Sequence, residues 1–161
     1  MHSDIGPFQA VLLARKVSTQ GELKINEAHL NAYLRTVTQI IPITDNPEAN
    51  IIRYFPESTA FIEQAIKENH NILVHCLAGV SRSPTILTAY LMATQKLRWK
   101  EALAIIKQTR PFVNPNPGFI EQLKLFQEMN YTFDPKHPAY LEYLHKHPVD
   151  AGHVGHEDEY E

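Results

Sequence analysis

One cysteine with an arginine six positions later is the feature of this sequence that has the clearest chemical meaning. Cys76 is the single cysteine among 161 residues. It follows the apolar run 72–74, which predicts a buried strand, and precedes residues 84–95, which predict an amphipathic helix. A thiol at a strand-to-helix turn with Arg82 close behind it indicates a nucleophile at the bottom of a phosphate-binding cradle.

The spacing between these two residues suits the binding of an anion. Five intervening residues are enough to curl the backbone so that successive N–H groups point inward. Gly79 supplies a residue without a Cβ where such a turn needs a positive φ, and Arg82 offers a planar fork to two phosphate oxygens. The same positive field is expected to lower the pKa of the Cys76 thiol. The expected phosphate-binding residues are Leu77, Ala78, Gly79, Val80, Ser81 and Arg82.

The stretch HCLAGVSRSPT resembles the signature of the cysteine-dependent protein phosphatases, and of their dual-specificity branch in particular. Two more segments resemble that branch: residues 43–55, similar to its acid loop and the helix that follows, and residues 110–119, similar to a later loop. Together the three segments cover about residues 40–130. The resemblance implies an α/β fold with a central, partly parallel sheet flanked by helices. The alternation of strand and helix patterns along the chain favours the same class.

The resemblance also implies a role for each site residue. A thiolate nucleophile would form a cysteinyl-phosphate, and a carboxyl group would protonate the leaving oxygen. A hydroxyl after the arginine would hydrogen-bond the sulfur, and two side chains would support the cradle. The implied catalytic residues are Cys76, Arg82, Asp45 and Ser83, and the implied supporting residues are His75 and Asn116.

The side chains within the cradle favour one substrate class over two others. Positions 77, 78, 80 and 81 carry no lysine. This favours a monophosphate on a protein, with phosphotyrosine expected and phosphoserine and phosphothreonine left open. Lipid phosphatases and RNA 5′-triphosphatases share the Cys-x5-Arg core but tend to place basic or strongly polar residues there. A phosphate-binding or scaffold module with little turnover is the alternative outside catalysis.

Composition restricts partners and compartment. The formal net charge is −3, with 43% hydrophobic and 20% charged residues, so neither nucleic acid nor a membrane is an expected partner. A single cysteine excludes an intramolecular disulfide, and a catalytic thiolate needs a reducing compartment, so we expect cytoplasm or nucleus. No cofactor or metal is expected, because the amides and Arg82 neutralise the phosphate. Composition says nothing about oligomeric state.

Two regions depart from the pattern of the family. A segment like Gly-Ile-Thr-x-Ile-Leu is missing before the acid loop, so the N-terminal edge of the sheet is expected to be shortened, or rebuilt from residues 8–13 and 39–43. Residues 1–130 are predicted to form the catalytic domain, and residues 131–161 a partly flexible C-terminal extension. That extension holds five histidines. The pairs 145/147 and 153/156 have metal-ligand spacing, but a solvated tail is the preferred interpretation.

Overall fold

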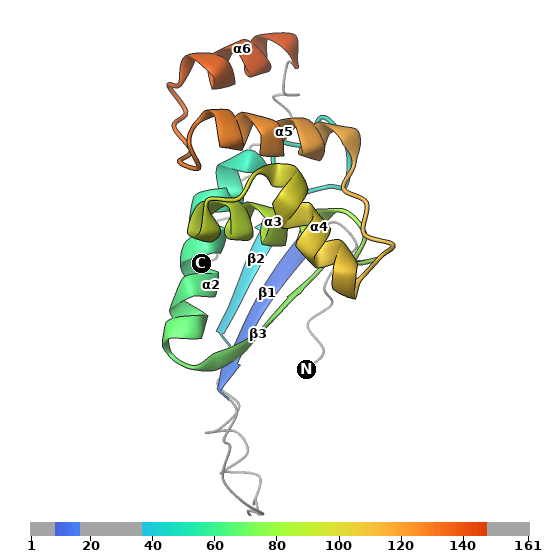
Figure 1. The fold of residues 1–161 in the computed structure, drawn as a ribbon, viewed down its shortest axis with the longest axis vertical. Coiled ribbons are helices and arrows are strands. Elements are labelled where there is room, and N and C mark those ends of the chain that lie inside the picture. The colour runs from blue at the N-terminus through green and yellow to red at the C-terminus, as the bar shows by residue number, and fades with distance from the viewer. Residues whose placement is uncertain (1–8, 17–36, 148–161) are drawn as a thin grey trace, which may run out of the picture.

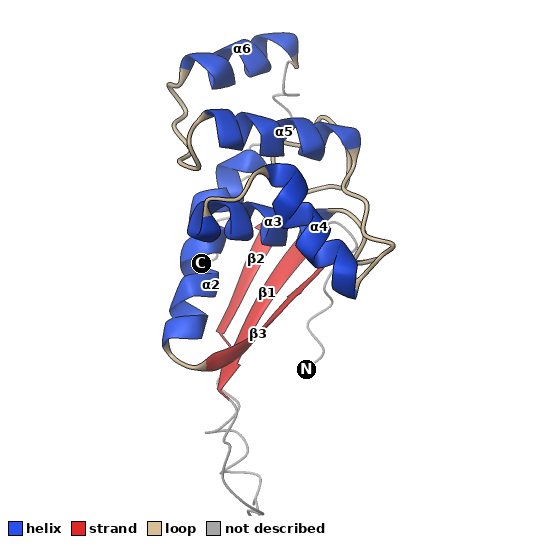
Figure 2. Ribbon diagram, in the orientation of Figure 1, coloured by secondary structure: helices blue, strands red, loops and turns tan. Residues whose placement is uncertain are grey.

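The computed structural model describes residues 9–16 and 37–147, and Figures 1 and 2 show how their helices and strands are arranged. The described residues contain three strands, a 3-10 turn and five helices. In chain order they are β1 (Gln9–Lys16), β2 (Val37–Pro42), η1 (Ile52–Tyr54), α2 (Phe55–Lys67), β3 (His70–His75), α3 (Arg82–Gln95), α4 (Trp99–Thr109), α5 (Pro117–Glu128) and α6 (Pro138–Lys146).

The described strands form one sheet in the order β2-β1-β3. β1 is antiparallel to both neighbours, and Val11 lies opposite Ile40 on one side and His75 on the other. β2 and β3 therefore point the same way but are separated by β1. The prediction of a partly parallel sheet is wrong for the described strands, because every strand pairing between them is antiparallel. The pattern of alternating strands and helices suggested neighbouring parallel strands, but the N-terminal segment supplies the strand that lies between them.

Both N-terminal segments that the sequence offered as strands are strands in the described structure. Residues 8–13 and 39–43 were the candidate segments, and the structure forms β1 and β2 over nearly the same positions. The apolar periodicity of the sequence predicts helices at 56–69, 84–95, 99–109 and 117–129. All four are present, with ends that shift by two residues or fewer. The hydrophobic periodicity therefore identified these elements correctly.

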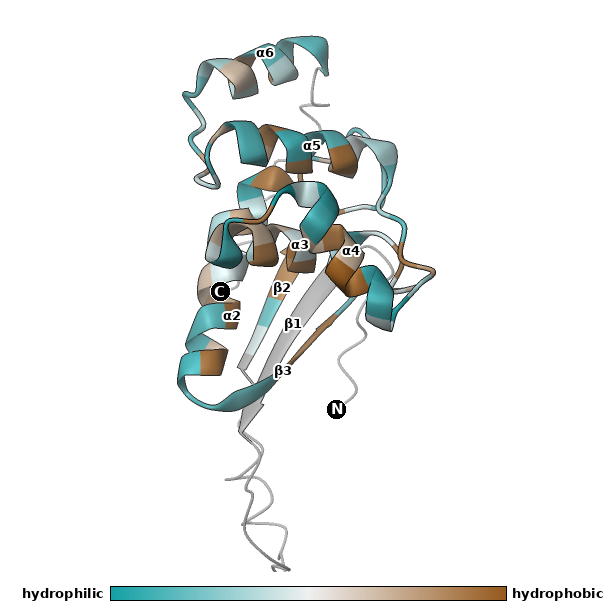
Figure 3. Ribbon diagram, viewed as in Figure 1, coloured by the Kyte–Doolittle hydropathy of each residue, from teal (hydrophilic) through white to brown (hydrophobic). Residues whose placement is uncertain are grey.

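The main core lies between one face of the sheet and the helices. Contacts from α2 and α3 reach β1 and β3, while α5 packs on α3. Figure 3 shows apolar positions on α3, on α4 and on the side of α5 next to α3. The largest fully buried side chains include Phe55, Phe119, Ile41 and Met92. The sheet end of this core carries Cys76, so packing of α2 and α3 fixes the position of the predicted nucleophile.

The C-terminal extension contains a helix that sequence analysis did not predict. α6 contacts α5, begins after His137, and has Tyr140 as its buried residue. His145 and His147 lie at its end, whereas 153 and 156 lie outside the described residues. Among the described residues, no group of three or more histidine, cysteine or carboxylate side chains could hold a metal ion. Likewise, none of the described helices combines the length and the apolar composition of a membrane span.

The aromatic contact between α2 and α5 allows a test of this packing. Phe126 is 2% exposed, and its ring meets that of Phe55 edge-on with centroids 5.1 Å apart. Replacing a buried phenylalanine with alanine costs about 3–5 kcal/mol, so Phe126→Ala should lower the free energy of unfolding by this amount. The measurement is urea denaturation followed by circular dichroism. Phe112→Ala is the matched control, because Phe112 is 57% exposed; equal losses in the two variants would contradict the assignment of the core.

Candidate active site

The turn between β3 and α3 forms the centre of the site. Cys76 directly follows β3, and α3 begins at Arg82 with Ser81 as its N-cap residue. Gly79 has φ +66°, so the sequence-based expectation of a positive φ at this glycine is confirmed. The five residues between Cys76 and Arg82 thus bend back on themselves, and the N-terminus of a 14-residue helix follows.

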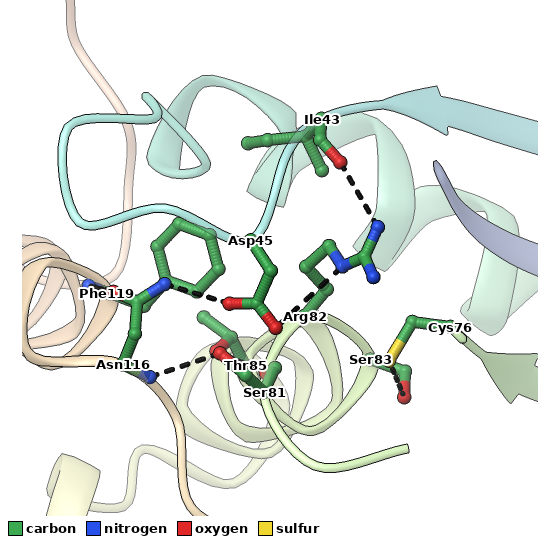
Figure 4. A network of polar contacts seen from close by, with 9 residues as sticks. All are labelled: Ile43, Asp45, Cys76, Ser81, Arg82, Ser83, Thr85, Asn116 and Phe119. Atoms are coloured by element: carbon green, nitrogen blue, oxygen red, sulfur yellow. Dashed lines mark hydrogen bonds and ion pairs between the residues drawn. The ribbon is translucent and has the colours of Figure 1, made fainter. Parts of the chain in front are cut away.

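The Cys76 thiol lies in surroundings that favour its ionised form. Burial acts to raise its pKa, but hydrogen bonds from the Ser83 side chain and from the backbone N–H groups of Ser83 and Gly79 outweigh it, and the Arg82 charge adds to their effect. The pKa of the thiol is therefore lowered, as the sequence predicted. The Sγ atom of Cys76 and the Oγ atom of Ser83 are 3.3 Å apart, which places the predicted hydroxyl against the sulfur (Figure 4).

The Arg82 side chain is buried and faces the segment after β2. Its Nη1 donates to the carbonyl oxygen of Ile43 at 3.4 Å, and its Nε lies 3.9 Å from an Asp45 carboxylate oxygen. Arg82 is 4% exposed, whereas the Asp45 side chain is 35% exposed. The carboxylate is thus anchored beside the guanidinium and still open to solvent. The structure brings together the two residues that the sequence placed 37 positions apart.

Asn116 joins the cradle to the acid loop. Its backbone N–H donates to the Ser81 hydroxyl at 3.0 Å, and its Nδ2 donates to an Asp45 carboxylate oxygen at 2.9 Å. Its Oδ1 accepts from the Phe119 N–H at 2.9 Å and caps α5. Asn116 was predicted to support the cradle; it bonds Ser81 there, and its supporting role stays a prediction. The side-chain bond to Asp45 was not predicted.

The acid loop, residues 45–52, rests on α5 through contacts that sequence reasoning missed. A Cβ added at Gly118 would lie 1.9 Å from the carbonyl oxygen of Pro47, so only glycine allows this close approach. The buried Gln122 amide accepts from the Ile52 N–H at 2.9 Å and donates to the Ala49 carbonyl at 2.8 Å. A glutamine on an otherwise apolar helix face was the available signal, because a buried amide must find partners.

The other wall of the cradle comes from α4 and the loop after it. The Asn114 N–H donates to the Val80 carbonyl at 2.8 Å, and Arg110 lies 3.0 Å from the position that a Cβ on Gly79 would take. A pocket of about 210 Å³ reaches Cys76 between β3, α3 and α4, with Arg110 in its lining. His75 ends β3 and is half-buried, and its supporting role stays a prediction. Leu77 and Ala78 are exposed at the rim.

The contact between Ser83 and Cys76 gives a prediction about thiol reactivity. Ser83→Ala removes a hydrogen bond that favours the thiolate, so the pKa of Cys76 should rise. Because only the thiolate reacts readily, the pH at which alkylation becomes fast should shift upward. The measurement is the rate of iodoacetamide modification from pH 5 to 9. Thr94→Ala, which removes a hydroxyl bonded to the Tyr90 carbonyl, is the control. An unchanged profile in Ser83→Ala would show that this hydroxyl does not stabilise the thiolate.

Comparison with known proteins gives the same family that the resemblance suggested. The chain is 43% identical to mouse "Dual specificity protein phosphatase 19" over 116 residues, which cover 71% of this chain and 53% of that protein. The crystal structure of DUSP15 is similar with a TM-score of 0.55 at 46% identity, covering 57% of this chain and 59% of that one. A human tyrosine phosphatase-like serine/threonine/tyrosine-interacting protein also has a TM-score of 0.55, at 37% identity, with 57% and 61% covered.

The similarity to these proteins covers part of each chain. The chain spans about half or less of the length of the first curated relatives that it matches. The family model "Dual specificity phosphatase, catalytic domain" matches residues 8–129, which include the cradle, Asp45 and Asn116 and stop before α6. On this match, the chain belongs to the dual specificity phosphatase catalytic domain family.

Proposed function

We propose that this chain is a protein phosphatase that hydrolyses phosphotyrosine, and with it phosphoserine or phosphothreonine, through a cysteinyl-phosphate intermediate. The single observation that carries the proposal is the environment of Cys76: a buried thiol of lowered pKa, hydrogen-bonded by Ser83, next to the start of α3. A thiolate in this place is a nucleophile held where an anionic phosphate would bind. Family membership supports the same activity.

In the first step, the Cys76 thiolate attacks phosphorus in line with the ester oxygen. The S–P bond forms as the P–O bond breaks, and Asp45 gives its proton to the leaving oxygen. The Arg82 guanidinium and the backbone N–H groups of residues 77–82 receive the equatorial oxygens, where negative charge is greatest. The exposure of the Asp45 side chain allows it to reach a leaving group that enters from solvent.

In the second step, water displaces the sulfur. Asp45, now ionised, accepts a proton from the attacking water, the P–S bond breaks, and inorganic phosphate leaves. The departing thiolate regains the hydrogen bond from Ser83, whose Oγ is 3.3 Å from Sγ. This bond lowers the cost of expelling sulfur, because it stabilises the charge that sulfur takes up.

The substrate class follows from the lining and the rim of the cradle. Leu77, 73% exposed at the rim, offers apolar surface to an aromatic ring, and no lysine stands within residues 77–81. A lipid or RNA substrate with several phosphates needs more positive charge than residues 77–81 supply, whereas a protein monophosphate does not. Because the mechanism needs a reduced thiol, we also place its activity in the cytoplasm or nucleus.

Binding of phosphorylated proteins without turnover is the second candidate. One similar solved structure is described as that of a tyrosine phosphatase-like interacting protein, so a likeness to this fold does not guarantee catalysis. The lowered pKa of Cys76 and the nearby Asp45 favour turnover, because a module that only binds needs neither.

A substrate panel separates these candidates. We expect phosphate release from phosphotyrosine peptides with a kcat/KM at least about tenfold above that for phosphoinositides or 5′-triphosphate RNA, a difference of about 1.4 kcal/mol. Cys76→Ser should abolish release and keep tungstate binding, because the amides and Arg82 remain. Faster release from a lipid or an RNA end would overturn the protein-phosphatase proposal. Absence of turnover with every substrate would favour the binding module.

The role of Asp45 has its own test. A general acid contributes roughly 10²–10⁴-fold to the rate and matters most for a poor leaving group. Asp45→Asn should therefore slow hydrolysis of a phosphotyrosine peptide far more than hydrolysis of an activated aryl phosphate. The measurement is kcat for both substrates, with Glu63→Gln as the control, since Glu63 is exposed on α2. Unchanged peptide turnover in Asp45→Asn would mean that another group supplies the proton.

A further inference from the structure

The helix α6 lies outside the family match yet touches the acid loop. The matched region ends at residue 129, and α6 spans Pro138–Lys146. Its Tyr140 is 6% exposed, and the ring packs edge-on against Phe133 with centroids 5.0 Å apart. The Tyr140 hydroxyl accepts a hydrogen bond from the Asn50 Nδ2 at 2.7 Å. Two segments 90 positions apart in the chain are thus joined by one short bond.

Asn50 lies in the part of the acid loop that is bonded to α5. It lies between Ala49 and Ile52, the two residues whose backbone groups bind Gln122 of α5. The Oδ1 atom of Asn50 is buried and has no hydrogen-bond partner among the described residues. Within the described structure, the Tyr140 hydroxyl is therefore the group that holds this side chain.

The same loop carries Asp45 at its other end. Asn116 and Arg82 contact the Asp45 carboxylate, whereas the Asn50 amide donates to the Tyr140 hydroxyl. The position of the carboxylate also depends on the course of the backbone from 45 to 52. That course is fixed on one side by α5, through Gln122, and on the other by α6, through Tyr140.

We propose that α6 positions the general acid, with Tyr140 and Asn50 as positioning residues that hold the acid loop over the cradle. This inference rests on the proposed role of Asp45. Loss of the hydroxyl leaves the Asn50 amide buried without a partner, so the loop populates other conformations and Asp45 spends less time beside the leaving oxygen. The cradle is built from residues 76–83 and does not depend on this bond.

The test compares leaving groups. Tyr140→Phe keeps the ring and its packing and removes only the hydroxyl. We expect kcat for a phosphotyrosine peptide to fall roughly three- to tenfold, as the loss of one buried hydrogen bond predicts, with little change for 4-nitrophenyl phosphate. The rate of Cys76 alkylation at pH 6 should stay unchanged. Tyr131→Phe is the matched control, because it removes a tyrosine hydroxyl that faces the Lys96 carbonyl instead.

Two more variants make the outcome decisive. Asn50→Ala removes the bond from the other side and should show the same dependence on the leaving group, and the double variant should lose no more than either single one. Asp45→Asn is measured in parallel. If Asp45→Asn lacks the leaving-group effect, the proposed acid is wrong. If it shows the effect while Tyr140→Phe and Asn50→Ala slow both substrates equally, or neither, the positioning role of α6 is wrong. Should Tyr140→Phe fail to fold, Asn50→Ala decides by the same criterion.

Discussion

The stabilisation of a negatively charged sulfur inside the protein is the constraint on which the rest of the site depends. Cys76 is 8% exposed, and burial by itself would keep the thiol protonated. Three donors overcome that tendency: the Ser83 hydroxyl and the backbone N–H groups of Ser83 and Gly79. These groups converge on sulfur only because the chain reverses at Gly79 and enters α3 at once. The register of β3 against β1 and the packing of α3 on the sheet therefore determine the chemistry as well as the stability.

The cradle and the acid loop come from separate parts of the chain, and Asn116 is where their positions are linked. One residue bonds Ser81, Asp45 and the first turn of α5. Its position as N-cap is what aligns these bonds, because the cap holds extended backbone and leaves the side chain free to turn back. A shift of α5 would consequently move the acid relative to the nucleophile. The close approach of Gly118 to Pro47 limits such a shift.

The sequence predicted the parts of the site that are local and missed those that depend on distant contacts. The cradle is a contiguous run from Cys76 to Ser83, so its geometry could be inferred from residue types and spacing alone. The helices around it were equally accessible, because their apolar periodicity is local. The strand order was not: nothing near Gln9 indicates that β1 separates β2 from β3. Pairing between strands depends on partners far along the chain, which a periodicity of two leaves undetermined.

Helix α6 is a second feature that depends on distant contacts and could not be predicted from the sequence. Its sequence was interpreted as a tail because histidines and charges dominate the end of the chain. Tyr140 packs on Phe133 and bonds Asn50, while Tyr143 and Leu144 also pack against the core. One buried aromatic residue on a nine-residue helix is too weak a pattern to predict that the helix packs on α5. The cradle is a contiguous run of residues, whereas the place of the acid depends on Arg82, on the N-cap of α5 and, through Asn50, on α6. The position of the acid is therefore the part of this site that sequence changes outside the signature can alter.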